Sequence, residues 1–294
     1  MNRLSFNAFQ SLDRHVLRKS SSFSQRQISL IARNYSRTIP FRSFASGTEI
    51  MAHFANKSLE GNDVAKAMEA LANADAVCFD VDSTVIQEEG IDVLAASLGK
   101  GEEVSAWTTK AMNGNTKFED ALAARLEIIK PSRKAIEQCL NDHPLKLSPG
   151  VDRLVEALGE KGIDVYLVSG GFRIMIEPVA KSLAISKSNI IANTIFFDED
   201  TPHGEYKGFC RDEPTSADMG KPKAVKLIKD KHDYKTIVMV GDGATDAQAK
   251  PPADAFIGFG GVTVRDAVKQ KACWYVYDFE DMISVVEKFS KSKL

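Results

Sequence analysis

The chain has 294 residues and a formal net charge of −2, with 44% hydrophobic and 27% charged residues. This length and composition are typical of a soluble globular protein with one well-buried domain and an insertion, or with two modest domains. The near-neutral charge argues against nucleic-acid binding. No run approaches 18 apolar residues, which argues against a membrane-spanning helix.

The N-terminal segment differs in composition from the rest of the chain. Residues 1–48 hold eight Lys or Arg, ten Ser and a single acid, Asp13. This pattern is typical of an organellar transit peptide, and the lack of an apolar core argues against a secretory signal. A solvated basic tail or a nucleic-acid-binding arm is the alternative. We predict a disordered transit peptide over residues 1–53. Without residues 1–48 the chain keeps 30 basic and 39 acidic side chains, a net charge of −9.

The cysteines and histidines indicate neither disulfides nor zinc. The four cysteines lie far apart without a C-x-x-C pair, and the five histidines show no spacing such as H-E-x-x-H. We interpret the cysteines as buried or incidental thiols of a reducing compartment. They are Cys78, Cys139, Cys210 and Cys273.

From about residue 75, short apolar runs alternate with helical patterns. Five runs are predicted strands, with a sixth candidate after them: Ala76–Phe79, Ile163–Val168, Ile190–Ile195, Ile237–Val240, Ala255–Ile257 and Trp274–Tyr277. One helix is predicted to begin at Ser148-Pro149 and to end at Lys161-Gly162, and another covers Lys221–Lys231. This alternation predicts an α/β fold, a parallel sheet with helices on both faces.

Residues 91–144 break the alternation, since only helical patterns occur there. They cover Ile91–Leu98, Glu102–Met112, Phe118–Ile129 and Ser132–Leu140. Asn113-Gly114 and Lys130-Pro131 separate them. Ordinary crossover helices are the alternative, but four in succession exceed one crossover. We predict a small helical bundle inserted into the α/β core.

Asp80 and Asp82 form a D-x-D pattern at the end of the first predicted strand. Ligands of open α/β sheets bind beyond the carboxyl ends of the strands, so both carboxylates lie where chemistry is expected. One can attack phosphorus or hold a metal, while the other donates and accepts a proton. Taken alone the pattern is weak, because Asp is common in loops.

A second pattern, Ser169-Gly170-Gly171, follows another predicted strand, with a helix expected from Phe172. A hydroxyl and backbone N–H groups at a helix start can bind an anion. An ordinary glycine-rich turn is the alternative. The pattern is not G-x-G-x-x-G, which disfavours a dinucleotide-binding fold.

Two further patterns lie nearer the C-terminus. Lys221 stands at a helix start, where the dipole disfavours a cation and a bound anion would offset the cost. Asp242 and Asp246 follow an apolar strand, and their carboxylates are the oxygen ligands that Mg²⁺ prefers. A surface lysine and an ordinary Asp-Gly turn are the alternatives.

Together, and in this order, these patterns resemble the four motifs of the haloacid dehalogenase superfamily from about residue 75 onward. Three segments look like those of its phosphoserine phosphatases, including the eukaryotic form: Asp80–Asp92, Gly241–Asp246 and Pro251–Gly261. The resemblance implies a Rossmannoid catalytic core over residues 54–90 and 145–294, with residues 91–144 as the cap.

The resemblance also implies a mechanism, the hydrolysis of O-phospho-L-serine to L-serine and phosphate in the last step of phosphorylated serine biosynthesis. Asp80 would attack phosphorus and become a phospho-aspartate. Asp82 would protonate the leaving oxygen and then deprotonate water. Mg²⁺ would be held by the carboxylates of Asp80 and Asp242 and the backbone carbonyl of Asp82, with Asp246 in support.

The remaining implied roles concern the phosphoryl group and the substrate. Ser169, the Gly170 and Gly171 amides and Lys221 would neutralise the phosphoryl oxygens. Glu89 would bind the amino group and Arg125 the carboxylate, although both could instead lie on a solvated helix surface. The positions that match the family's substrate-binding residues are Glu89, Met112, Asn113, Arg125, Thr245 and Arg265.

Asn113 and Thr245 depart from the family pattern, in which glycine and asparagine occur at those positions. We expect both to tune affinity without changing the reaction class. The alternative function is a phosphatase or phosphotransferase of the same superfamily that acts on another small phosphomonoester. A degenerate binding module is disfavoured because all the expected catalytic residues are present.

The resemblance and the serine-rich N-terminus favour the chloroplast stroma, with the mitochondrion as the alternative. We expect a small-molecule substrate and neither a nucleic-acid nor a membrane partner. A homodimer is left open.

Overall fold

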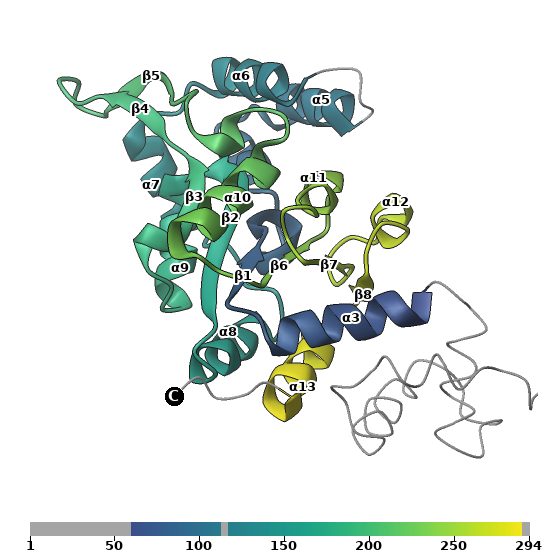
Figure 1. Cartoon of the computed structure of the whole chain (residues 1–294). Coiled ribbons are helices and arrows are strands. Elements are labelled where there is room, and N and C mark those ends of the chain that lie inside the picture. Colours follow the sequence, from purple (N-terminus) through teal and green to yellow (C-terminus); the bar gives the residue numbers. More distant parts are fainter. Residues whose placement is uncertain (1–59, 113–116, 290–294) are drawn as a thin grey trace, which may run out of the picture. The chain divides into compact units, whose positions relative to one another are not determined.

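The computed structural model describes residues 60–112 and 117–289 (Figure 1). The predicted transit peptide and Asn113 lie outside the described residues. Within those ranges, no helix has the length and apolar character needed to cross a membrane.

A six-stranded sheet forms the core, with the strand order β3-β2-β1-β6-β7-β8. All neighbouring strands in it are parallel, which confirms the predicted fold class. Its members are β1 Ala76–Phe79, β2 Asp164–Phe172, β3 Ile190–Asn193, β6 Ile237–Gly241, β7 Ala255–Phe259 and β8 Trp274–Val276. Every residue of β1, β6 and β7 is buried, which explains why these strands are continuous apolar runs in the sequence.

The order of the strands reverses between β1 and β6. The chain passes from β1 to β2 and β3 on one side, and then returns to β6, β7 and β8 on the other. Phe79, the last residue of β1, lies in register with Val240 of β6. A ligand-binding crevice is expected beyond the carboxyl ends of strands at such a switch point. Asp80 and Asp242 are the first residues after these two strands, so the topology alone brings them together.

Helices pack on both faces of the sheet (Figure 1). On one face, α10 Gly220–His232, α11 Ala244–Gln248 and α12 Asp266–Lys269 border a cluster that includes Cys78, Val225 and Met239. The alternate side chains of β1 point to the opposite face. There the ring of Phe79 meets that of Phe279 with centroids 6.3 Å apart. Figure 1 shows three helices grouped at the lower side of the view: α3 Glu60–Ala72, α8 Val151–Glu160 and α13 Glu280–Phe289.

The predicted helices of residues 91–144 are all present. They are α4 Gly90–Ser97, α5 Gly101–Met112, α6 Phe118–Ile129 and α7 Arg133–Asp142. The hydroxyl of Ser132 caps α7 by accepting a hydrogen bond from the Ala135 N–H at 3.2 Å. Figure 1 shows α5 and α6 at the upper side of the view, whereas α3, α8 and α13 lie at its lower side.

The predicted C-terminal end of the strand Ile190–Ile195 is wrong. β3 stops at Asn193, and Ile195 begins a separate strand, β4 Ile195–Asp198, which pairs antiparallel with β5 Glu205–Phe209. The sequence did not predict this hairpin, because β5 is largely exposed and carries no apolar run. Ile195 and Phe209 instead pack with Leu122 and Leu126 of α6, so the hairpin and the helical insertion share one apolar cluster.

Two helix starts also differ from the prediction. α8 begins at Val151, after Gly150 with φ 83°, and not at Ser148-Pro149. The buried hydroxyl of Ser148 has no hydrogen-bond partner, so it caps no helix. β2 continues through Phe172, and its helix, α9 Arg173–Ser182, begins one residue later than expected. The predicted end of α8 at Lys161-Gly162 and the helix over Lys221–Lys231 are confirmed.

All four cysteines are free thiols, and three of them are buried. Burial raises the pKa of the Cys78 thiol to about 12, because the thiolate would lose its hydration inside the sheet. The interpretation of the cysteines as thiols outside disulfides is therefore confirmed.

Candidate active site

The chain leaves β1 in one wide turn, Val81–Val85, which begins directly after Asp80 and contains Asp82. The Ile86 N–H closes the turn on the Val81 carbonyl at 3.0 Å, and Ser83 takes a left-handed φ of 53°. Asp80 accepts a hydrogen bond from the Val81 N–H at 2.7 Å. Asp82 accepts one from the Gly90 N–H, also at 2.7 Å. Each carboxylate is thus held by the N–H of a different backbone residue.

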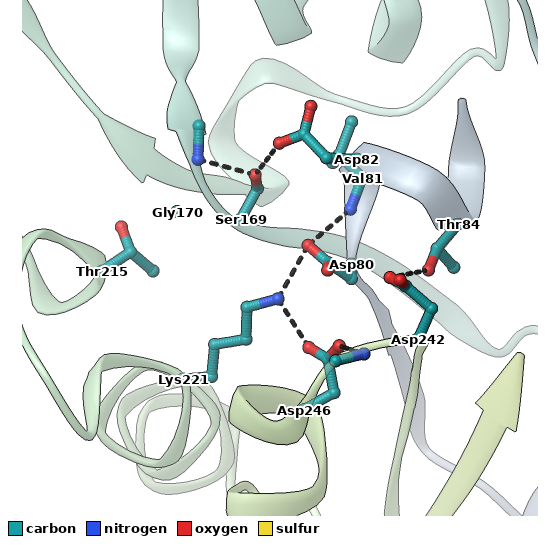
Figure 2. Close-up of polar contacts among 12 residues, drawn as sticks. Asp80, Val81, Asp82, Thr84, Ser169, Gly170, Thr215, Lys221, Asp242 and Asp246 are labelled. Atoms are coloured by element: carbon teal, nitrogen blue, oxygen red, sulfur yellow. Dashed lines mark hydrogen bonds and ion pairs between the residues drawn. The ribbon is translucent and has the colours of Figure 1, made fainter. Parts of the chain in front are cut away.

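Lys221 lies at the centre of the buried charges. Its Nζ is 2.7 Å from Asp80 Oδ1 and 2.5 Å from Asp246 Oδ1. Dashed lines mark both contacts in Figure 2. Burial alone would lower the pKa of this ammonium, but the carboxylates of Asp246 and Asp80 raise it above its usual value. The anion expected beside this lysine is therefore, in the structure, a pair of carboxylates.

Asp80, Asp242 and Asp246 form a candidate metal site. One carboxylate oxygen of each lies within 4.8 Å of the others, and all three side chains are buried. Oxygen ligands of this kind suit Mg²⁺. Burial and the neighbouring Asp80 carboxylate raise the pKa of Asp246 to about 8. A divalent cation would offset this concentration of negative charge, so the donor set fits the predicted metal. The Asp82 backbone carbonyl stays a predicted ligand.

The glycines around Asp246 allow the close approach of its carboxylate. A Cβ on Gly241 would lie 2.2 Å from Asp246 Cγ, a distance that no side chain could accept. The Gly243 N–H donates to Asp246 Oδ2 at 2.8 Å and fixes the carboxylate at the start of α11. The spacing of these three residues therefore has a steric cause.

Asp242 is held from two sides. The Thr84 hydroxyl donates to Oδ1 at 3.2 Å, and Arg265 donates to Oδ2 from Nε at 3.0 Å. Burial and Asp80 raise the pKa of Asp242, which Arg265 partly counteracts. Sequence reasoning did not identify Thr84, although its place directly after the D-x-D pattern, at the same strand end, could have indicated it. Arg265, a predicted substrate-binding residue, contacts this predicted metal ligand.

The Ser169–Gly171 loop is an irregularity within β2, between Val168 and Phe172, where the register with β3 shifts, and Ser169 lies beside Asp82 (Figure 2). Ser169 Oγ accepts a hydrogen bond from the Gly171 N–H at 2.8 Å and donates to Asp82 Oδ2 at 3.4 Å. A Cβ on Gly171 would be 3.0 Å from the same Asp82 oxygen, so the loop and the carboxylate are in close contact. Burial, followed by the Glu89 and Asp80 carboxylates, raises the pKa of Asp82 to about 7. A carboxyl group with this pKa can both donate and accept a proton near neutral pH.

Glu89 directly precedes α4, where the core meets the helical insertion, and Arg125 lies in α6. Glu89 accepts a hydrogen bond from the Ser83 hydroxyl at 2.7 Å and lies 3.9 Å from Arg265. Burial raises the pKa of Glu89. Burial lowers the pKa of Arg125, whereas the charges of Asp92, Glu89 and Asp82 act in the opposite direction. The structure therefore brings Arg125 into the field of Glu89 and Asp82, 36 to 43 positions away in the sequence.

The other predicted substrate residues are placed less fully. Thr245 lies in the first turn of α11 and is half-buried. Met112 is the last residue of α5, and only its backbone is described. Asn113 lies outside the described residues.

Comparisons with known proteins identify the family of the chain. The family model for haloacid dehalogenase-like hydrolases matches residues 74–251. A phosphoserine phosphatase of Bos taurus is 50% identical over 216 residues, which cover 74% of this chain and 95% of that protein. A chloroplastic phosphoserine phosphatase of Arabidopsis thaliana is 48% identical over 232 residues, 78% of each chain.

Solved structures show the same fold. A phosphoserine phosphohydrolase-like protein from Francisella tularensis matches with a TM-score of 0.62 and 28% identity, over 72% of this chain and 99% of that one. DsGPDH of Dunaliella salina matches with a TM-score of 0.66 and 36% identity over 74% of this chain. The match spans only 37% of the Dunaliella protein.

Proposed function

Since the chain belongs to the haloacid dehalogenase-like hydrolases and, among them, to the phosphoserine phosphatases, we propose that it hydrolyses O-phospho-L-serine to L-serine and phosphate. This reaction is the last step of serine biosynthesis by the phosphorylated route. The observation that carries the proposal is the buried Asp80, paired with Lys221 at the carboxyl end of β1 and beside the proton-transferring candidate Asp82.

In the first step, a carboxylate oxygen of Asp80 attacks phosphorus. An O–P bond forms to Asp80 while the bond between phosphorus and the serine oxygen breaks. Asp82 gives its proton to the departing oxygen, so that serine leaves as the neutral hydroxyl. The raised pKa of Asp82 supports this role, because a carboxyl with a pKa of about 7 is half protonated at neutral pH.

In the second step, Asp82 takes a proton from water as the water oxygen attacks the phospho-aspartate. The O–P bond to Asp80 breaks, phosphate is released, and Asp82 regains the proton that the first step consumed. The Asp80 and Asp242 carboxylates and the Asp82 carbonyl, with Asp246 in support, would hold Mg²⁺, whose chemical contribution would be positive charge beside the phosphoryl oxygens. The proximity of the Asp80, Asp242 and Asp246 carboxylates supports their assignment as metal ligands.

The phosphoryl oxygens would be bound by Lys221, Ser169 and the Gly170 and Gly171 amides. The Gly171 N–H donates to Ser169 Oγ in the structure, so it would exchange this contact for one with the phosphoryl group. An ammonium carries three N–H donors, and two of those on Lys221 point at Asp80 and Asp246. The third N–H of the ammonium would donate to a phosphoryl oxygen. The Ser169 hydroxyl donates its one proton to Asp82 at 3.4 Å in the structure, so a phosphoryl oxygen would replace Asp82 as its acceptor.

We assign substrate recognition to Glu89 for the ammonium and to Arg125 for the carboxylate, with Met112, Asn113, Thr245 and Arg265 around them. The charges of Glu89 and Arg125 match the two charges of an amino acid. Each is partly desolvated, which strengthens a charge-assisted hydrogen bond.

Residues 91–144 are proposed to cover the site as a cap. Two contacts at the start of α6 support this proposal. The Glu119 carboxylate accepts a hydrogen bond from the Asp218 N–H at 3.1 Å. The ring of Phe118 lies against Gly170, where an added Cβ would be 2.8 Å from Cζ. A cover of this kind excludes water from the phospho-aspartate during the first step.

The test is a steady-state assay of the full chain with Mg²⁺ against phosphoserine, phosphothreonine, glycerol phosphate and p-nitrophenyl phosphate. We expect the highest kcat/KM on phosphoserine. A higher value on another physiological ester would replace the substrate assignment and keep the chemistry. Failure to hydrolyse any of them would contradict the proposed function.

The proposed location is the chloroplast stroma. The Arg- and Ser-rich composition of residues 1–48 and the similarity to a chloroplastic relative support it. Residues 1–48 fused to a fluorescent reporter should carry it into chloroplasts of plant cells. Mitochondrial fluorescence would favour the alternative location, and a diffuse cytosolic signal would show that the segment is not a transit peptide.

A further inference from the structure

Asn193, the last residue of β3, is fully buried beside the Ser169–Gly171 loop. Its side-chain amide donates to the Gly170 carbonyl at 2.8 Å and to the Thr215 carbonyl at 3.2 Å. Its Oδ1 accepts a hydrogen bond from the Thr215 hydroxyl at 3.0 Å. Both amide donors and the acceptor are thus used, and they join the loop to a segment 22 residues further along the chain.

Thr215 (Figure 2) connects the same contacts to the helix that carries Lys221. The segment around it lies directly against the start of α10. A Cβ on Gly220 would be 2.4 Å from the Pro214 carbonyl oxygen and 2.9 Å from Thr215 Cα. Because Lys221 is the next residue, a shift of Thr215 would move the start of α10 and, with it, the ammonium.

A continuous series of hydrogen bonds runs from Thr215 to Asp82. Thr215 donates to Asn193, and Asn193 donates to the Gly170 carbonyl. That carbonyl belongs to the same planar peptide as the Gly171 N–H, so fixing one orients the other. The Gly171 N–H donates to Ser169 Oγ, and Ser169 donates to Asp82 Oδ2.

We infer that Asn193 and Thr215 are positioning residues for the phosphoryl group, an inference that rests on the proposed function. The pair sets the Ser169–Gly171 loop and the start of α10 in one fixed arrangement. The two groups proposed to bind phosphoryl oxygens from opposite elements, the loop and Lys221, are thereby held at a constant separation. Neither positioning residue needs to touch the substrate.

The segment has a separate anchor, which makes this role distinguishable from a purely structural one. Glu213 accepts hydrogen bonds from the Thr194 N–H at 2.5 Å and from Arg173 Nη2 at 3.1 Å. Arg173 also donates to two carbonyls of β3. Removing the Thr215 hydroxyl leaves these contacts in place, so the segment stays attached while its link to Gly170 is weakened.

The main test compares Thr215→Val, which removes only the hydroxyl, with Thr215→Ser, which keeps it. For Thr215→Val we expect kcat/KM to fall about three- to tenfold, the effect of one lost neutral hydrogen bond. The fall should be equal on phosphoserine and on p-nitrophenyl phosphate, since only the phosphoryl group is common to both. The inhibition constant of inorganic phosphate should rise by a similar factor. Thr215→Ser should restore all three values.

Asn193→Ala is the stronger variant, with an expected loss of roughly ten- to a hundredfold because two donors and an acceptor disappear. Asn189→Ala is its matched control. Asn189 also donates to a backbone carbonyl of β2, that of Val165 at 3.0 Å, but at the far end of the strand. We expect kcat and KM of this control within about twofold of wild type.

The inference is overturned if Thr215→Val keeps wild-type kcat/KM and phosphate inhibition and changes only the melting temperature. It is also overturned if the loss is confined to phosphoserine, which would indicate an effect on amino-acid recognition. Should Asn193→Ala fail to fold, Thr215→Val decides by itself. A wild-type chain that hydrolyses no phosphomonoester would contradict the proposed function, a result separate from either of these.

Discussion

The two sides of the active site differ in how firmly their charges are held. On the core side, Lys221 lies within 2.7 Å of both Asp80 and Asp246, and none of these side chains is more than 12% exposed. On the cap side we include Glu89, which directly precedes α4, the first helix of this side. It keeps 35% of its side chain exposed and lies 3.9 Å from Arg265. Buried charged groups whose hydrogen bonds and ion pairs are all satisfied keep a fixed geometry, which the reaction at phosphorus requires. Half-buried charges can exchange their contacts for those of a substrate. We therefore expect the core side to determine the chemistry and the cap side to determine the choice of substrate.

The largest effect is expected on the core side, from Asp80→Asn. The amide is nearly isosteric but a poor nucleophile, so turnover of every phosphomonoester should be lost. Steady-state rates on phosphoserine and p-nitrophenyl phosphate measure this, with circular dichroism to show that the protein still folds. Near wild-type activity on either substrate would rule out a phospho-aspartate on Asp80.

Asp82→Asn should lower kcat by roughly 10²–10⁴-fold, because the amide can neither donate nor accept the transferred proton. The Gly90 N–H can still donate to the amide oxygen, so the turn after β1 should be preserved. The measurement is kcat on phosphoserine across pH 5 to 9. A loss of less than about tenfold would show that Asp82 is not the proton-transferring group.

Glu89→Gln tests the cap side and should lower kcat/KM on phosphoserine by about ten- to a hundredfold. The lost charge-assisted contact with the ammonium is worth roughly 1.5–3 kcal/mol. Glu88→Gln is the matched control, since Glu88 is the neighbouring glutamate and bonds to the Lys146 N–H instead. Equal losses in the two variants would remove the assigned role of Glu89.

The smallest effect concerns the metal and pH. The folded-state pKa of Asp246, about 8, lies above its ordinary value of 3.8. The metal-free fold therefore binds this proton more tightly than the unfolded chain, and it loses stability as pH rises from about 4 to about 8. Mg²⁺ competes with the proton for the Asp246 carboxylate. The increase in the Tm of the protein on adding Mg²⁺, a few degrees, should therefore be larger at pH 8 than at pH 6.

Calorimetry with Mg²⁺ or EDTA at the two pH values measures this difference. Asp242→Asn is the control, because it removes one proposed ligand and should abolish most of the gain. The same gain at both pH values would show that the metal does not displace this proton. The absence of any gain would argue against a metal at these carboxylates.

Features of the structure that depend only on residues adjacent in the sequence could be predicted from the sequence. The strand β1 and the helix α6 have the predicted bounds, because each is a run of local signals. Asp80 and Asp242 could be placed at one edge of the sheet, since both directly follow a buried strand. Asp246 depends on Gly241 and Gly243 within the same turn. All of these residues belong to local patterns that the sequence predicts as parts of the site.

Features that depend on tertiary contacts were not predictable in the same way. The exposed strand β5 has no apolar alternation and is held by pairing with β4. Arg265 reaches Asp242 across 23 residues, without any local pattern. Asn193 ends a strand as an ordinary polar residue, and its amide has partners only where the fold brings Gly170 and Thr215 beside it. Each case needs the fold before the contact can be inferred.

The contrast between the two sides is tested most directly by Arg125→Ala, assayed on phosphoserine and on p-nitrophenyl phosphate. The charges of Asp92, Glu89 and Asp82 raise the pKa of Arg125 against the effect of burial, and Arg125 is assigned to the substrate carboxylate, which p-nitrophenyl phosphate lacks. We expect kcat/KM to fall about ten- to a hundredfold on phosphoserine and less than about threefold on p-nitrophenyl phosphate. Equal losses on both substrates would mean that Arg125 supports the fold or the chemistry, and would contradict the division between the two sides.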